Sequence, residues 1–213
     1  MQLLSINVGW PQLVQYQGRT ITTAIFKLPV EGQVEVTEMG LAGDEQADKS
    51  VHGGVDKAVY AYDTQDYQWW QQELDGRELA PGEFGENLTV QGLPSDQVCI
   101  GDRYRIGTVL LEVTQPRQPC AKLGVRMQMP SIVKQFHQAG RPGFYLRVLE
   151  SGTLTAGDSI ERVERPEHTL SIPEIYRLRF HSSASTAEVT RAANLTRLSE
   201  SWRDDFCNLL ESR

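Results

Sequence analysis

The stretch RYRIGTVLLEVT, residues 103–114, indicates the fold class of this chain. It contains two short β-like runs, 103–106 and 109–114, on either side of the turn residues Gly107 and Thr108. Runs of apolar and β-branched residues that are bounded by glycine are typical of short β-strands. The stretch therefore predicts two strands joined by a tight turn.

Similar runs recur along the first three quarters of the chain, at residues 3–8, 33–37, 58–62, 88–90, 144–149 and 159–163. Many short strands with glycine turns imply a barrel-like β domain. A helical pattern occurs twice in this part, at residues 63–74, which Asp63 can cap, and at residues 131–139, which Gly140 closes. We therefore expect a mainly β fold with a few helices.

The composition changes near Pro166. All 18 glycines lie at or before Gly157, and the remainder starts several helix-like segments. Ser171 and Ser185 each begin a Ser-x-x-Glu pattern, and Ser199 can cap a third helix. The predicted organisation is a β-barrel domain over residues 1–165 and a small three-helix extension over residues 166–213. Helices this short should pack on one another, on the β domain or on a second subunit.

The net charge of −7 disfavours a broad electrostatic grip on nucleic acid or on an anionic membrane. The expected partner is therefore a small molecule. Three cysteines that are far apart form no disulfide framework or metal knuckle. No leader segment and no apolar run of membrane-spanning length is visible, so a reducing cytoplasm is the expected location.

The tract QPRQPCAKL, residues 115–123, surrounds Cys120 with two prolines and two cations, Arg117 and Lys122. Prolines stiffen the approach, and nearby cations favour a thiolate at neutral pH. A thiolate on a rigid arm can ligate a soft metal, attack an electrophile or carry a sulfur atom. The alternative is a buried, inert cysteine, which is the commoner fate of this residue type.

Residues 40–57 contain four glycines together with His52, Lys49 and Lys57. Backbone N–H groups at Gly53 and Gly54 could face an anion, with the neighbouring histidine and lysines as further donors. This tract could hold a phosphate, or it could be a wide turn in which the histidine bonds to backbone.

Residues 81–88 form a third tract, PGEFGENL, before a predicted strand. Here Glu86 and Asn87 present the acceptor and donor edges that a heterocycle requires. The alternative is a β-turn with a local asparagine bond. Three such tracts on one small barrel favour a shared pocket.

Together the tracts read Gly-Leu-x-Gly-Asp ending in His-Gly-Gly, then Phe-Gly-Glu-Asn-Leu, then Pro-Arg-x-Pro-Cys-x-Lys-Leu. In this order they resemble the MOSC family, named after the C-terminal domain of molybdenum-cofactor sulfurase, and in particular its free-standing, YiiM-type bacterial members. The resemblance covers about the first 165 residues. The helical extension is similar to one found after such domains, with a looser match.

The resemblance implies a β-rich MOSC fold in which Cys120 binds the molybdenum of a pyranopterin (molybdopterin) cofactor. By the same resemblance, Glu86 would line the pocket, and our hypothesis is that it is the acid that delivers protons. The residues that would hold the cofactor are Asp44, His52, Gly53, Gly54, Lys57, Gly85, Asn87, Arg117 and Lys122.

The implied reaction is reduction of N-hydroxylated compounds, such as N-hydroxylaminopurine bases, by oxygen-atom transfer at molybdenum. Electrons would come from a separate NADPH-dependent flavoprotein, because the chain has no flavin or nucleotide motif. A homodimer is a further expectation. Two alternatives stay open: a cofactor carrier or sulfur-transfer protein with a persulfide on Cys120, and an interaction module that works through the helical extension.

Overall fold

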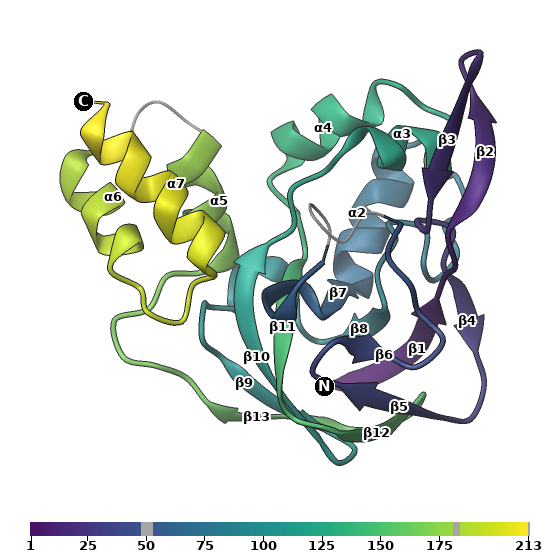
Figure 1. The fold of residues 1–213 in the computed structure, drawn as a ribbon, viewed down its shortest axis with the longest axis horizontal. Coiled ribbons are helices and arrows are strands. Elements are labelled where there is room, and N and C mark those ends of the chain that lie inside the picture. Colours follow the sequence, from purple (N-terminus) through teal and green to yellow (C-terminus); the bar gives the residue numbers. More distant parts are fainter. Residues whose placement is uncertain (48–52, 181–183, 213) are drawn as a thin grey trace.

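The computed structural model describes residues 1–47, 53–180 and 184–212 (Figure 1). Its strands are β1 (Gln2–Val8), β2 (Gln12–Tyr16), β3 (Arg19–Thr23), β4 (Leu28–Val30), β5 (Gln33–Thr37), β6 (Gly40–Leu41), β7 (Val59–Asp63), β8 (Leu88–Gln91), β9 (Arg103–Ile106), β10 (Val109–Pro116), β11 (Phe144–Glu150), β12 (Gly152–Thr155) and β13 (Ile160–Glu164). Its helices are η1 (Val55–Lys57), α2 (Thr64–Glu73), η2 (Ser95–Gln97), α3 (Ala121–Met127), α4 (Ile132–Ala139), α5 (Ile172–Phe180), α6 (Thr186–Ala193) and α7 (Glu200–Glu211). The mainly β class is confirmed.

The centre of the molecule is an eight-stranded sheet in the order β13-β9-β10-β11-β7-β8-β1-β4. It curls so that β1 approaches the start of β13, where Gln2 forms an isolated bridge with Ser159. The Leu3 amide donates to the Asp158 carbonyl at 2.9 Å across the same junction. The ladders of the described strands do not run continuously around the sheet, so the fold is barrel-like without being a closed barrel.

Each strand predicted from the sequence is present, with ends shifted by a residue or two. The sequence analysis missed β2 and β3, a two-stranded hairpin that projects from the upper edge in Figure 1. It also missed the short strands β4, β6 and β12 and the helix α3. The hairpin turns at Gln17 and Gly18, both with positive φ, and its strands are mostly polar and solvent-exposed, so they lack the alternation that marks a half-buried strand.

One parallel strand pair brings two of the glycine-containing tracts together. β7 and β8 run in parallel with Ala61 opposite Leu88, whereas the other ladders between described strands are antiparallel. Parallel neighbours need a crossover connection, and α2 lies within it. As a result, the segments before β7 and before β8 enter the sheet at the same edge.

An aromatic cluster supports this edge of the sheet. Asp63 caps α2 by accepting from the Gln65 amide at 2.8 Å, as the sequence predicts. Tyr67 and Trp70 of that helix are buried in the cluster, which Phe84 and Phe136 complete. These two aromatic residues of α2 therefore belong to the core.

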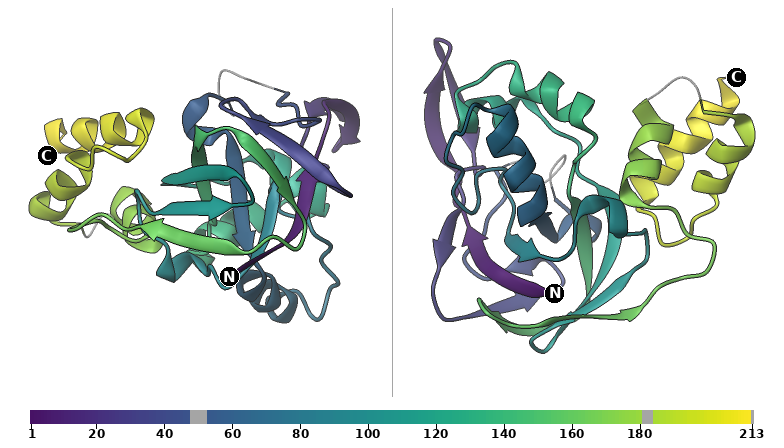
Figure 2. Two further views of the ribbon diagram at one scale, coloured as in Figure 1. Left: turned by 90° about the horizontal axis from the view of Figure 1, so that it is seen from below. Right: turned by 180° about the vertical axis from the view of Figure 1, so that it is seen from behind.

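The three C-terminal helices stand beside the sheet (Figure 2) and pack on it through a shared core. One hydrophobic cluster contains Leu111 of β10, Ile175 of α5 and Phe206 of α7. Backbone hydrogen bonds also hold the segment that leads from β13 into α5. The Ile172 amide donates to the Val98 carbonyl, and the Ile100 amide donates to the Leu170 carbonyl, both at 2.9 Å. The three-helix extension is thus present, and its status as a separate domain remains a prediction.

Capping follows the sequence at α6, where Ser185 and Glu188 form a reciprocal capping box. Ser171 and Glu174 make the equivalent bonds at the start of α5. Ser199 occupies the N-cap position of α7 but makes no capping bond through its side chain. Among the described residues, no helix combines the length and the apolar character needed to cross a membrane.

Candidate functional site

Cys120 lies directly after the end of β10 and is the residue that precedes α3. Its side chain is half-buried. The arm before it is fixed by Pro116, which pairs with Phe144 of β11, and by the Arg117 amide, which donates to Gly143 at 3.4 Å. α3 can approach closely because a Cβ on Gly124 would lie 3.2 Å from the Met129 carbonyl oxygen. The sulfur is therefore held on a short, well-anchored arm.

An open pocket borders Cys120, with an empty volume of about 650 Å³ that includes space open to solvent. Its lining includes seven of the residues predicted for the site: Asp44, Lys57, Gly85, Asn87, Arg117, Cys120 and Lys122. They come from the loop after β6, from η1, from the segment before β8, from the arm before α3 and from the first turn of α3. The structure thus brings the three predicted tracts to one pocket.

Gly85 allows the wall before β8 to lie close to the opposite loop. Its φ is +79°, and an added Cβ would lie 2.8 Å from a side-chain carbon of Ile25. Both the backbone conformation and the close contact disfavour any larger residue. This is the physical reason for the Phe-Gly-Glu-Asn pattern at the pocket.

Asn87 and Asp44 form the floor of the pocket. The Asn87 amide nitrogen donates to Asp44 Oδ2 at 2.8 Å and to the Asn7 carbonyl at 3.3 Å, while its Oδ1 accepts from the Tyr60 amide at 3.1 Å. Asp44 Oδ1 accepts from the Gly9 amide at 2.8 Å and also pairs with Lys27. Asn87 therefore uses its hydrogen-bonding capacity mainly to hold neighbouring segments in place.

Lys27 is a pocket residue that the sequence analysis missed. It lies before β4, and burial lowers its pKa against the opposing effect of Asp44. Burial also lowers the pKa of Lys57, with Asp56 acting in the opposite direction. Both lysines contribute positive charge to a partly desolvated pocket, where an anion would be held more strongly than in water.

Arg117 is the most deeply buried cation of the pocket, with 5% of its surface exposed. Its guanidinium carbon lies 5.4 Å from the Tyr60 ring centre and 5.2 Å from that of Phe136. Burial lowers its pKa, but Tyr60 and Cys120 raise it, and the net shift is upward. Its Nη1 has no hydrogen-bond partner among the described residues. A buried, charged donor without a partner indicates a missing acceptor.

Glu86 does not line the pocket. It is fully buried, and its carboxylate accepts from the Gly82 amide at 2.8 Å, the Phe84 amide at 3.2 Å and the Thr89 hydroxyl at 2.7 Å, and also from Tyr67. Burial raises its pKa, while these hydrogen bonds act in the opposite direction. The carboxylate is thus occupied in fixing the 82–89 segment, a geometry that gives no support to the predicted proton delivery.

The predicted role of Gly53 and Gly54 at the pocket has less support. Gly54 has φ +98° and precedes η1, and its carbonyl accepts from the Lys57 amide at 2.9 Å. Neither Gly53 nor Gly54 is among the described residues that line the pocket. His52 lies outside the described residues, so its predicted contact with a phosphate stays a prediction.

Tyr60 and Tyr145 are further pocket residues that sequence reasoning missed. Their ring centres are 5.2 Å apart, and burial raises the pKa of both phenols. They belong to β7 and β11, whose local sequences predict only a strand. The pairing of Tyr145 with Tyr60, which places both at the pocket, is a tertiary fact without a local signal.

A second hollow of about 790 Å³ lies between Cys120 and the C-terminal helices. It shares Lys57, Gln118, Cys120 and Tyr145 with the first pocket. Its remaining lining residues are Gln115 and Pro119, and from α5 and α7 Arg179, Ser201, Trp202 and Asp205. Cys120 can therefore be approached from two sides.

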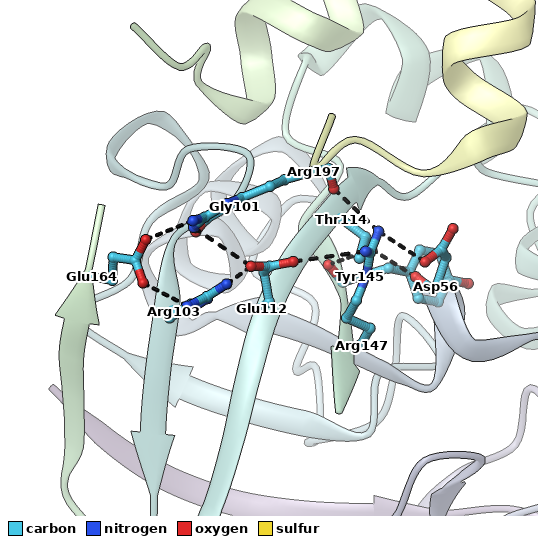
Figure 3. A network of polar contacts seen from close by, with 9 residues as sticks. All are labelled: Asp56, Gly101, Arg103, Glu112, Thr114, Tyr145, Arg147, Glu164 and Arg197. Carbon is cyan, nitrogen blue, oxygen red and sulfur yellow. Dashed lines mark hydrogen bonds and ion pairs between the residues drawn. The ribbon is translucent and has the colours of Figure 1, made fainter. Parts of the chain in front are cut away.

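A network of ion pairs connects η1, which borders the pocket, to the helical extension (Figure 3). Asp56, the neighbour of Lys57, pairs with Arg147 at 2.9 Å, and Arg147 also lies 3.7 Å from the buried Glu112. Glu112 in turn lies 2.8 Å from Arg103 and 3.5 Å from Arg197, which is in the loop before α7. The Thr114 hydroxyl donates to the Asp56 carbonyl at 2.6 Å, so η1 is fixed on both sides.

The fold and the pocket define a small sheet-rich protein that presents a cysteine in a cationic pocket. More specifically, the chain belongs to the MOSC domain family, whose model matches residues 48–161. It is 40% identical to the uncharacterized protein YflK of Bacillus subtilis over 96% of this chain and 92% of YflK. The crystal structure of YiiM from Geobacillus stearothermophilus superimposes with a TM-score of 0.83 at 39% identity and covers 98% of both chains. A Gibberella moniliformis protein named "Reductase" is 39% identical over 76% of this chain and 29% of its own length. The resemblance expected from the sequence is confirmed.

Proposed function

We propose that this protein binds the molybdenum pyranopterin cofactor in the Cys120 pocket and uses it to reduce N-hydroxylated compounds. The observation that carries the proposal is the position of a half-buried thiol beside a buried arginine whose Nη1 lacks an acceptor. Membership of the MOSC family and similarity to a protein named "Reductase" also support it.

The donor set fits such a cofactor. Among the described residues, no group of three or more histidine, cysteine, aspartate or glutamate side chains could hold a metal ion. A metal at Cys120 would therefore need to arrive with most of its ligands already attached, as a pyranopterin provides through its own two sulfur atoms. A single soft thiolate from the protein then suits a soft or intermediate metal centre.

The pocket also fits the anionic end of the cofactor. Arg117 offers an unpaired N–H in a rigid planar fork, the geometry that suits a phosphate. Lys57 and Lys122 line the same pocket and would add positive charge. On the floor, Asp44 Oδ2 accepts from Asn87 and can accept one further hydrogen bond from a heterocycle.

When bound, the cofactor supplies a two-electron centre that accepts the oxygen atom of an N–OH group. Conversion of R–NHOH to R–NH2 and water consumes two electrons and two protons. The chain contributes the Cys120 ligand, and Tyr60 and Tyr145 contribute walls that exclude water. We propose that the electrons come from a separate NADPH-dependent flavoprotein, and that the substrate is a small molecule such as an N-hydroxylaminopurine.

The test compares the wild-type protein with Cys120→Ser after production in a molybdenum-replete host. We expect molybdenum near one atom per chain in the wild type and reduction of 6-N-hydroxylaminopurine by a chemically reduced viologen dye, which replaces the flavoprotein. Cys120→Ser should lose both properties and keep the thermal unfolding midpoint. Cys207→Ser, at an exposed position of α7, is the matched control and should keep both.

Two results would contradict the proposal. Full activity in Cys120→Ser would remove the thiol from the mechanism. A wild-type protein without molybdenum, whose Cys120 carries the mass of one extra sulfur atom, would instead identify a sulfur-transfer protein.

A further inference from the structure

The wall of the hollow between Cys120 and the C-terminal helices includes a residue with a buried hydrogen-bond acceptor that nothing in the described chain satisfies. Gln115 lines this hollow and is 3% exposed. Its Oε1 has no partner among the described residues, and its Nε2 makes one long bond of 3.5 Å to the Pro116 carbonyl. A buried amide oxygen that is left without a donor is costly, so its presence in the wall of a hollow points to a ligand.

The backbone explains how a glutamine comes to occupy this position. The pairing of β10 with β11 changes register between Val113 and Gln115. A β-bulge of this kind re-aims the side chain that follows it. Gln115 lies opposite Tyr145, which belongs to both the hollow and the cofactor pocket, and it precedes Cys120 by five residues.

The opposite wall is preorganised by the helical extension. The Arg179 guanidinium lies against the rings of Phe180 and Trp202, at 4.9 and 4.8 Å from their centres. It donates to Gln118 Oε1 at 2.9 Å and pairs with Asp205. Gln118 therefore has its donor, which leaves Gln115 as the unsatisfied amide and Asp205 as a second acceptor near the rim.

We infer that this hollow binds the nitrogen-bearing part of the substrate, a planar aminoheterocycle whose N–H groups donate to Gln115 Oε1 and to Asp205. The inference rests on the proposed function, which requires the N–OH group of the substrate to point toward Cys120. It adds that the C-terminal helices form one wall of the substrate site. The substrate would thus reach the cofactor from the side of Cys120 that faces the C-terminal helices.

The direct test is binding of adenine, the amine product of 6-N-hydroxylaminopurine, to cofactor-free protein by titration calorimetry. Gln115→Met keeps the side-chain length and removes the acceptor, so we expect adenine affinity to fall about tenfold, the effect of one lost hydrogen bond. The thermal unfolding midpoint should stay the same or rise, because an unsatisfied polar group has been removed. Gln72→Met, at an exposed position of α2, is the matched control and should bind adenine as the wild type does.

A second pair of variants covers the case in which Gln115→Met does not fold. Ser201 is an exposed residue of α7 that lines the hollow, and Asn208 is an exposed residue of the same helix that does not. Ser201→Trp should block adenine binding, whereas Asn208→Trp should leave it unchanged. Wild-type affinity in Ser201→Trp, or in folded Gln115→Met, would overturn the inference, as would a wild-type protein that does not bind adenine.

These outcomes are separate from those of the proposed function. Adenine binding that depends on Gln115, in a protein that reduces no N–OH compound, would retain the subsite and reject the reaction. Reduction of 6-N-hydroxylaminopurine with an unchanged KM in Gln115→Met would retain the reaction and reject the subsite.

Discussion

The sheet-rich part and the helical extension are stabilised in different ways. In the former, irregular segments next to the pocket are fixed by buried polar side chains, of which Glu86 and Asn87 are examples. In the latter, amphipathic helices bury residues such as Val189 and Phe206, and α5 and α6 begin with exposed capping bonds. The difference teaches that the shape of the pocket depends on a few saturated polar groups, whereas the helical wall depends on many small apolar contributions.

The largest expected effect is at Glu86. Replacing it with alanine leaves the buried donors of Gly82, Phe84, Thr89 and Tyr67 without their acceptor. We expect a loss of about 3 kcal/mol or more in the free energy of unfolding, measured with denaturant. Glu35→Ala, at an exposed position of β5, is the control and should change little. Near wild-type stability in Glu86→Ala would break the proposed contrast between the two parts.

The next effect concerns Glu112, which joins the two parts through three arginines (Figure 3). Glu112→Gln keeps the side-chain shape and removes a buried charge that faces Arg103, Arg147 and Arg197. Because these arginines are partly exposed and keep other acidic partners, we expect a loss of about 2 kcal/mol, below the usual cost of breaking a buried pair. Glu150→Gln, which breaks the exposed pair with Arg105, should have no resolvable effect on the same unfolding curve. Equal effects of the two variants would mean that the network does not couple the parts.

A smaller effect is expected at the start of α6. Ser185→Ala removes the hydroxyl that accepts from the Glu188 amide and should lower the free energy of unfolding by about 1 kcal/mol. Ser199→Ala is the matched control, because Ser199 makes no capping bond through its side chain. A larger loss in Ser199→Ala than in Ser185→Ala would contradict the capping analysis.

The smallest effect is a difference in pH dependence between two glutamates. Hydrogen bonds from the Ser185 backbone and from Arg177 lower the pKa of Glu188 to about 2, against an ordinary value of 4.5. Its stabilising effect is therefore present above about pH 4.5 and is lost as the pH falls toward about 2. The pKa of Glu86 is instead raised by burial, so its contribution to stability increases as the pH falls through that raised pKa.

The corresponding measurement is the unfolding free energy of Glu188→Gln and wild type between about pH 5 and about pH 3. Glu188→Gln should lose less stability over this range than the wild type. Glu31→Gln, at an exposed loop position, serves as the control and should follow the wild-type curve. An identical pH profile for Glu188→Gln and wild type would show that the capping carboxylate does not contribute.

Much of the fold could be predicted because its signals are local. The two β-like runs in residues 103–114, the Asp63 cap and the Ser185 capping box each depend on neighbours in sequence, and each is found in the structure. α3 could not be predicted in the same way, since Gly124 in its middle lowers helix propensity and the close contact with Met129 compensates for it. The β2–β3 hairpin was missed because its two faces differ little in polarity.

The residues of the candidate site also fall into those with a local sequence signal and those without one. Cys120, Lys57 and Asn87 could be found from dense local patterns of glycine, proline and charge. Lys27 and Tyr145 could not, because their place at the pocket is set by pairings between distant strands and loops. Glu86 was assigned to the pocket by its neighbours in sequence, but the turn formed by residues 81–87 instead sends its side chain toward Thr89 and Tyr67.

The parallel pairing of β7 with β8 has a consequence for how relatives of this chain can diverge. The two segments that enter these strands are aligned by the ladder itself, through Ala61 and Leu88, and independently of the path between the strands. Insertions or deletions on the far side of that path, at the exposed turn residues Asp75 and Gly76, should therefore accumulate during evolution without moving either pocket segment. The same stretch is a suitable place to graft an affinity tag or a fluorescent reporter.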